Sequence, residues 1–221
     1  MAKKNVLETT TEPLPQRVTA GLGKIGLAIK HRAWKGAGTR RLAPLQAQTL
    51  SLIQTRAGRE STVSAIAKQL AVSLPTISEV VQTLEQKGLV KKVRSETDAR
   101  VVTVALTPKG RQKSGEAAGW TDFLTGAVDQ LPQDEQVALL HMLIKMIRLL
   151  QKRGEIPIAR MCVSCRYFRP NVYADPENPH HCAYVNAPFG DRLLRIDCAE
   201  HEPATKAQAE RNWKVFIQDR R

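Results

Sequence analysis

The sequence predicts a mainly α-helical fold with one small β-hairpin (α+β), followed by a loop-rich segment that contains every cysteine. Apolar residues recur at helical spacing over most of the chain, whereas residues 89–106 alternate between apolar and polar side chains as strands do. The four cysteines all lie between Cys162 and Cys198. With 42% hydrophobic and 25% charged residues, the 221-residue chain has the composition of a globular protein with room for a substantial core.

Two helices joined by a short break carry the clearest local signals. Thr62 is a helix-capping residue type, and the apolar residues after it recur three, four and seven positions apart. A second helix opens at Ser73, accepts Pro75 in its first turn and stops at Gly88. The break at residues 71–72 makes this pair a helix-turn-helix.

The same spacing rules predict the elements on both sides of this pair. We expect helices at about 18–34, 44–58, 107–128 and 132–150, and a hairpin of strands 89–94 and 100–106 with a polar tip at 95–99. The helix at 132–150 is apolar on nearly every side. It must therefore lie deep in a core or at a subunit interface.

Basic residues dominate the first half of the chain. The net charge is +13, and residues 1–110 hold 18 Lys and Arg against 7 Asp and Glu. Such an excess favours a polyanionic partner, either nucleic acid or an anionic membrane surface. No apolar stretch approaches the roughly 20 residues of a membrane span, and the N-terminus lacks the apolar core of an export signal. The sequence therefore predicts a cytoplasmic protein that does not cross a membrane.

Three helices followed by a basic hairpin form the arrangement of a winged helix, which predicts binding to double-stranded DNA. The second helix of the pair turns hydroxyl and amide side chains outward, and these suit base edges or phosphates in the major groove. Basic side chains on the hairpin suit the DNA backbone or a minor groove. The predicted contacts are Ser73, Thr76, Ser78, Gln82 and Thr83 on the helix, and Lys91, Lys92, Arg94 and Arg100 on the hairpin.

Three motifs in the order 84–93, 98–100 and 106–110 resemble the wing signature of the MarR family of bacterial regulators. They read Leu-Glu-Gln-Lys-Gly-Leu-Val-Lys-Lys-Val, Asp-Ala-Arg and Leu-Thr-Pro-Lys-Gly, within a resemblance that covers roughly residues 40–115. The resemblance implies a homodimer whose terminal helices interlock and whose two recognition helices enter successive major grooves of a pseudo-palindromic operator. It also implies wing-tip roles for Asp98 and Arg100, the latter in a minor groove, while Ala99 stands where the family often has arginine.

The four cysteines follow the pattern C-x2-C-x16-C-x15-C, which is typical of a metal site. The segment 154–203 around them is rich in proline and loops and poor in core residues, so it cannot easily fold by burial alone and a metal would supply the missing stability. Zinc would take Cys162, Cys165, Cys198 and His201, whereas an iron–sulfur cluster would take all four cysteines. Four reduced, inert thiols or a dithiol switch are the remaining interpretations.

The cysteine segment resembles the cluster-binding part of high-potential iron–sulfur proteins. The shared features are the C-x2-C pair followed by an aromatic residue, and then two single cysteines at mid-teens spacing. This resemblance implies a [4Fe–4S] cluster held by Cys162, Cys165, Cys182 and Cys198. Beyond it, apolar residues at helical spacing predict a final helix within 204–221 that packs on the dimerisation helices.

These observations give four expected parts. They are a flexible basic tail at 1–17, a winged-helix domain with dimerisation helices at 18–153, a metal-binding segment at 154–203, and a C-terminal helix at 204–221. The expected function is that of a transcriptional regulator, acting as a repressor, whose operator affinity depends on a cluster that senses redox or iron status. The alternative is a regulator that responds to a small organic ligand, with Zn²⁺ as a structural metal.

The sequence does not favour an enzyme. Residues 21–26 match G-x-G-x-x-G, but no strand precedes them and no acidic residue follows about 20 positions later, as a dinucleotide site requires. A redox enzyme that uses the cysteines directly would need a companion active site, and a C-x2-C pair outside a thioredoxin-like context is a weak signal for one.

Overall fold

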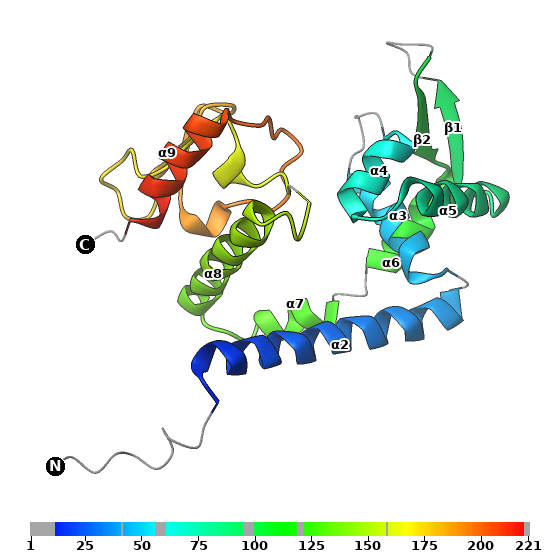
Figure 1. Cartoon of the computed structure of the whole chain (residues 1–221), viewed down its shortest axis with the longest axis horizontal. Helices are drawn as coiled ribbons and strands as arrows, with labels where there is room; N and C mark the ends of the chain where they lie inside the picture. Colours follow the sequence, from blue (N-terminus) through cyan, green and yellow to red (C-terminus); the bar gives the residue numbers. More distant parts are fainter. Residues whose placement is uncertain are drawn as a thin grey trace.

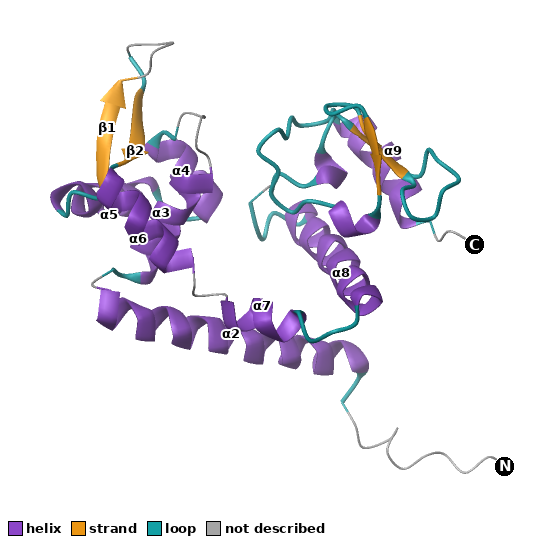
Figure 2. Cartoon of the chain, turned by 180° about the vertical axis from the view of Figure 1, so that it is seen from behind, coloured by secondary structure: helices purple, strands orange, loops and turns teal. Residues whose placement is uncertain are grey.

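The computed structural model describes residues 12–40, 42–55, 61–94, 100–118, 122–157 and 159–218. They form two lobes, with one long helix, α2 (Leu14–Arg40), running along both (Figure 1). The short helix α7 (Asp122–Val128) lies beside α2 in both views (Figures 1 and 2), and the Arg32 guanidinium lies over the Phe123 ring at 5.4 Å. Within the described residues, no helix is long and apolar enough to cross a membrane.

The first lobe is a winged helix. It contains α3 (Pro44–Thr55), α4 (Val63–Leu70), α5 (Leu74–Gln86), β1 (Val90–Arg94), β2 (Val102–Leu106) and α6 (Pro108–Ala118). The two strands pair antiparallel, with Val90 opposite Leu106. Leu50, Ile66 and Ile77, one from each of the first three helices, are fully buried in a single core. The predicted mainly helical fold with a hairpin wing is therefore confirmed.

The predicted helix-turn-helix forms for the local reasons that its sequence indicates. The Thr62 hydroxyl accepts a hydrogen bond from the Ala65 N–H at 3.2 Å, and the Ser73 hydroxyl caps α5 by accepting one from the Thr76 N–H at 3.3 Å. After α5, Gly88 adopts a φ of +68°, a left-handed conformation that side chains with a Cβ rarely adopt. The chain can therefore turn directly from α5 into the wing.

Two of the expected helices differ from the structure, and the first of them also continues to Arg40 rather than ending near Trp34. The first described helix begins at Leu14 rather than Val18, because Pro15 is compatible with a first helical turn, where its missing N–H needs no partner. Residues 14–17 are therefore helical and not part of a tail, whereas 1–11 lie outside the described residues. The helix expected over 107–128 is described as α6 and α7, and residues 119–121 between them lie outside the described residues.

The second lobe surrounds one end of α8 (Gln133–Lys152). Its remaining elements are η1 (Cys162–Ser164), β3 (Phe168–Arg169), β4 (His180–Cys182), β5 (Ala187–Phe189), η2 (Asp191–Leu193) and α9 (Lys206–Ile217). The strands form a three-stranded antiparallel sheet in the order β3-β4-β5. Thr205 caps α9 by accepting a hydrogen bond from the Gln208 N–H at 3.3 Å.

This lobe has a core of its own, which corrects the expectation that the cysteine segment buries little. Met161, Val163 and Phe168 are buried together with Ile144 of α8 and Phe216 of α9. The sequence signal was weak because these residues lie in turns and short strands, where no helical or alternating period marks them. The core holds the cysteine segment and α9 against α8.

Candidate DNA-binding surface and cysteine cavity

The recognition helix α5 presents a polar face opposite its buried one. Ile77, Val81 and Leu84 are buried. The predicted contact residues lie elsewhere on the helix: Ser73, Ser78 and Gln82 are exposed, and Thr76 and Thr83 are half-buried. These polar side chains give α5 an outward face that a DNA groove could meet.

The hydroxyls on α5 bond within their own helix in this structure. The Ser78 Oγ donates to the Leu74 carbonyl and the Thr83 Oγ1 donates to the Glu79 carbonyl, each at 2.9 Å. Gln82 carries an exposed amide with both donor and acceptor groups, the combination that reads adenine in the major groove. Gln82 is therefore the side chain on this face best suited to base recognition.

The wing carries exposed cations beside the recognition helix. Lys91, Lys92, Arg94 and Arg100 are all exposed. The Lys92 ammonium lies 3.1 Å from the Glu85 carboxylate of α5, so one wing cation is tied to the recognition helix. Asp98 and the rest of the predicted tip at 95–99 lie outside the described residues.

Leu74 is a feature of this surface that the sequence did not single out. It is the first residue of α5 and is 52% exposed. The N-terminal residues of a recognition helix meet base edges, and an apolar side chain there suits a thymine methyl group. Its spacing of three from the buried Ile77 is typical of a core residue, which is why the pattern gave no sign of its exposure.

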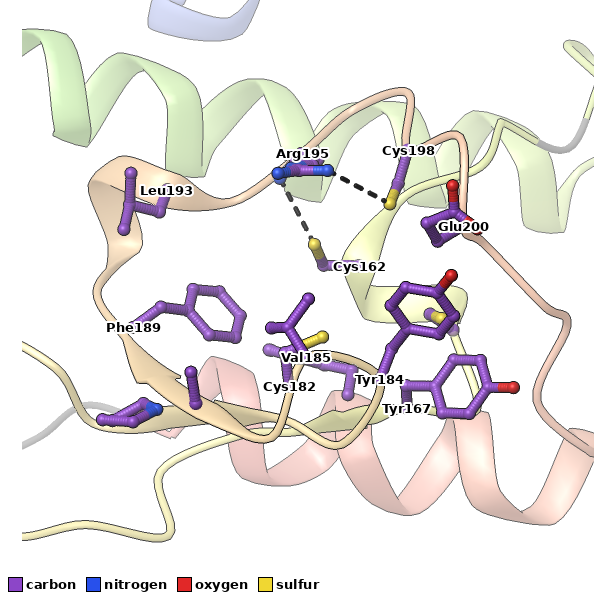
Figure 3. Close-up of a pocket in the computed structure, with 14 residues that line it drawn as sticks. Cys162, Tyr167, Cys182, Tyr184, Val185, Phe189, Leu193, Arg195, Cys198 and Glu200 are labelled. Carbon is purple, nitrogen blue, oxygen red and sulfur yellow. Dashed lines mark hydrogen bonds between the residues drawn. The ribbon is translucent and has the colours of Figure 1, made fainter. Parts of the chain in front are cut away.

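All four cysteines line one cavity of about 300 Å³. Cys162 and Cys165 flank the η1 turn, Cys182 ends β4, and Cys198 lies in the loop after η2, so three separate segments meet there (Figure 3). The thiols form no disulfide. Aromatic side chains make up much of the remaining wall, namely Tyr167, Phe168, Tyr184 and Phe189.

Backbone pairing holds the first and last cysteines in place. The Cys162 N–H donates to the Arg195 carbonyl at 3.1 Å, and the Cys198 N–H donates to the Arg160 carbonyl at 3.0 Å. The Arg160 guanidinium also makes two hydrogen bonds to the Asp197 carboxylate, at 2.6 and 2.9 Å. These contacts join two loops of the cavity wall whose ion-paired residues, Arg160 and Asp197, are 37 positions apart in sequence.

Arg195 contacts two of the thiols. Its backbone N–H donates to the Cys162 Sγ at 3.3 Å, and its guanidinium donates to the Cys198 Sγ at 3.7 Å (Figure 3). Burial raises the pKa of the Cys162 thiol to about 11, an effect that the hydrogen bond from Arg195 partly opposes. A basic residue three positions before a cysteine is not distinctive in sequence, so this contact was not foreseen.

The match to a protein family lies in the first lobe. Residues 42–101 match the family model described as MarR family, a range that includes α3, the helix-turn-helix and the first wing strand, β1. This part of the chain is therefore similar to the MarR family. The chain is also 32% identical over 93 residues to the HTH-type transcriptional regulator MgrA of Staphylococcus aureus. That match covers 42% of this chain and 63% of MgrA, so it spans less than two thirds of the relative.

Solved structures with the same fold include two that contain DNA. Streptococcus pneumoniae FabT in complex with DNA matches with a TM-score of 0.52 and 24% identity, over 62% of this chain and 97% of that chain. The S. aureus MepR–DNA complex matches with a TM-score of 0.51 and 24% identity, over 60% of this chain and 97% of the MepR chain. At this identity both support the fold alone.

The cysteine cavity lies outside the MarR-family match. The four cysteines line the wall of this cavity without converging on one point, and the Nε2 of His201 lies 3.0 Å from the Ser164 hydroxyl. His180 is buried, with its Nε2 2.8 Å from Asp191. In the part of the chain that the structure describes, no three His, Cys, Asp or Glu side chains converge closely enough to hold a single metal ion.

Proposed function

We propose that this chain is a DNA-binding transcriptional regulator that acts by binding rather than by catalysis. The observation that carries the proposal is the MarR-family winged helix at 42–101, in which the polar face of α5 stands beside the exposed cations of β1. In this arrangement α5 enters the major groove while the wing follows the phosphate backbone. The chain is then expected to repress transcription where it occupies an operator.

The DNA-binding proposal is tested by the salt dependence of binding to a duplex that the wild-type protein enriches from random sequence. Lys91→Ala and Arg94→Ala are each expected to lower the slope of log affinity against log salt by about one, because each removes a phosphate contact. Gln82→Ala is expected to leave that slope unchanged and to weaken binding by about 1–3 kcal/mol, because it removes a base contact.

Lys206→Ala is the matched control for the wing lysine, since Lys206 lies on α9 in the other lobe. Its affinity and salt slope are expected to equal those of the wild type. Equal affinities and equal salt slopes for the Lys91→Ala and Lys206→Ala proteins would show that the wing does not contact DNA.

We further propose that a second copy of the chain covers the apolar face of α2. Leu14, Val18, Leu22 and Ile25 recur at helical spacing and are 37–69% exposed in the single chain. Met142, Met146 and Leu149 form a second exposed stripe along α8. Burying these faces in a homodimer would remove apolar surface from water and present two recognition helices to a pseudo-palindromic operator.

A single charge on the α2 stripe tests the dimer. The wild-type protein is expected to have twice the chain mass of 24.5 kDa by light scattering, and Leu22→Glu is expected to shift it toward the monomer because a carboxylate would be buried at the interface. Gln16→Glu is the control, since Gln16 is exposed on the opposite face of the same helix. Equal masses by light scattering for the Leu22→Glu and Gln16→Glu proteins would place the dimer interface away from the α2 stripe.

We infer that the four cysteines hold a [4Fe–4S] cluster. Four cysteine thiolates are the usual donor set of such a cluster, and here all four thiols surround one cavity with aromatic walls. The aromatic side chains would limit access of water to the centre, which is one way in which a protein sets its potential. When bound, the cluster would make the second lobe sensitive to redox or iron status.

The core of the second lobe connects the cavity to α8. Phe168 lines the cavity, and its ring centroid lies 6.0 Å from that of Phe216 in α9. Phe216 in turn contacts His141 of α8 edge-on, with a centroid distance of 4.5 Å. A change at the cysteines would therefore reach α8, and through the dimer it would alter the separation of the recognition helices from the roughly 34 Å of one DNA turn.

Metal and sulfide analysis of protein purified without oxygen tests the cluster. We expect a brown protein with broad visible absorption and about four irons and four sulfides per chain. A colourless protein with one zinc per chain would contradict this. It would favour the alternative in which zinc is structural and an organic ligand is the signal.

A further inference from the structure

We propose that Arg195 is a positioning residue that raises the reduction potential of the centre held by the four cysteines. This inference rests on the iron–sulfur cluster proposed above. Arg195 reaches Cys162 through its backbone N–H and Cys198 through its guanidinium, so one residue contacts the first and the last cysteine of the set. Arg195 lies outside residues 42–101, which match the MarR family model.

The backbone of Arg195 is fixed independently of its side chain. Its carbonyl accepts a hydrogen bond from the Cys162 N–H at 3.1 Å, while its own N–H donates to the Cys162 Sγ at 3.3 Å. The preceding Leu194 is buried in the core of the lobe, which anchors the loop. A substitution of the Arg195 side chain therefore removes the guanidinium and leaves the backbone contact to Cys162 in place.

Arg195 is the basic residue that lines the cavity. The Arg160 guanidinium also acts on Cys198, but it is ion-paired with Asp197. Glu200 is the acidic residue that lines the cavity, on the same side as Cys198 (Figure 3). Asp197 is closer to Arg195 in sequence, but its carboxylate is engaged by the Arg160 guanidinium at 2.6 Å. The guanidinium of Arg195 can therefore act on the Cys198 sulfur without being neutralised by Asp197.

A hydrogen-bond donor and a positive charge beside a thiolate ligand favour the reduced state of a cluster. Reduction by one electron adds one negative charge to a cluster, and hydrogen bonds to the ligand sulfurs together with a nearby cation stabilise that charge. Since Arg195 is exposed, salt screens part of its effect. Arg195 thus sets the potential at which the proposed sensor responds.

Potentiometric titration of the cluster-loaded protein with one-electron mediators tests the inference. Arg195→Gln is expected to keep the wild-type iron and sulfide content. At a fixed potential its ratio of reduced to oxidised cluster is expected to fall about tenfold, a downward shift of about 59 mV. Arg195→Lys keeps the positive charge but loses the planar guanidinium with its paired N–H donors, so a smaller downward shift of the reduction potential is expected. High salt should lower the wild-type potential toward that of Arg195→Gln.

Arg192→Gln is the matched control. Arg192 is also exposed, lies in the adjacent turn, and pairs with Glu177 at 3.4 Å instead of with a cysteine. Equal potentials for the Arg195→Gln and Arg192→Gln proteins, each with full iron content, would overturn the role of Arg195 and leave the cluster standing. A wild-type protein without iron would instead overturn the proposed cluster.

If Arg195→Gln fails to retain iron, Arg195→Lys is compared with Arg192→Lys. A lower reduction potential in Arg195→Lys but not in Arg192→Lys supports the inference. Equal reduction potentials for the two proteins contradict it.

Discussion

Replacing Cys182 with serine is expected to abolish cluster binding and to change the affinity for operator DNA by about 5- to 150-fold. Cys182 lies in the middle strand of the small sheet, where it pairs with Phe168 of β3. Serine keeps the size of the side chain but removes the thiolate that iron requires. The measurements are iron content and the fluorescence anisotropy of a labelled duplex, both made without oxygen.

Two comparisons separate loss of the cluster from damage to the fold. Val172→Ser changes an exposed apolar residue of the same lobe that does not belong to the cysteine set, so its iron content and affinity are expected to match the wild type. Wild-type protein from which a chelator has removed the iron is expected to bind DNA like Cys182→Ser. Equal DNA affinity of the loaded and iron-free proteins would make the centre structural, and the DNA-binding proposal would remain.

The winged helix could be predicted closely because its determinants are local. Thr62 and Ser73 cap helices through hydrogen bonds to residues three positions away, and the buried face of α5 repeats at helical spacing. The hairpin follows from alternation within a few residues. Short-range rules suffice where each contact joins neighbours in sequence.

The second lobe was predicted less well because its contacts are long-range. The Arg160–Asp197 ion pair and the Ser164–His201 hydrogen bond each join residues that are 37 positions apart, and no period in the sequence marks them. The cysteine pattern indicated a set of metal ligands, and the structure brings all four around one cavity. It could not indicate that Arg195 would contact two of the thiols, or that His201 would turn to Ser164.

The largest effect on stability is expected from Gly110→Ala in the winged-helix lobe. Gly110 lies in the first turns of α6, and a Cβ there would collide with the Leu89 carbonyl oxygen. That carbonyl cannot move freely, because it accepts hydrogen bonds from the Thr107 N–H at 3.0 Å and from the Thr107 hydroxyl at 3.2 Å. The absence of a side chain thus lets α6 approach the start of the wing.

We expect Gly110→Ala to lower the free energy of unfolding by about 3 kcal/mol, the upper range for overpacking a rigid site, and to weaken DNA binding by displacing the wing. Gly115→Ala on the same helix meets no atom within 4 Å and should raise the stability by up to about 1 kcal/mol through better helix propensity. Urea unfolding followed by circular dichroism measures both. Similar free energies for the two variants would show that the wing adjusts to the added methyl group, and that close contact between α6 and Leu89 does not position it.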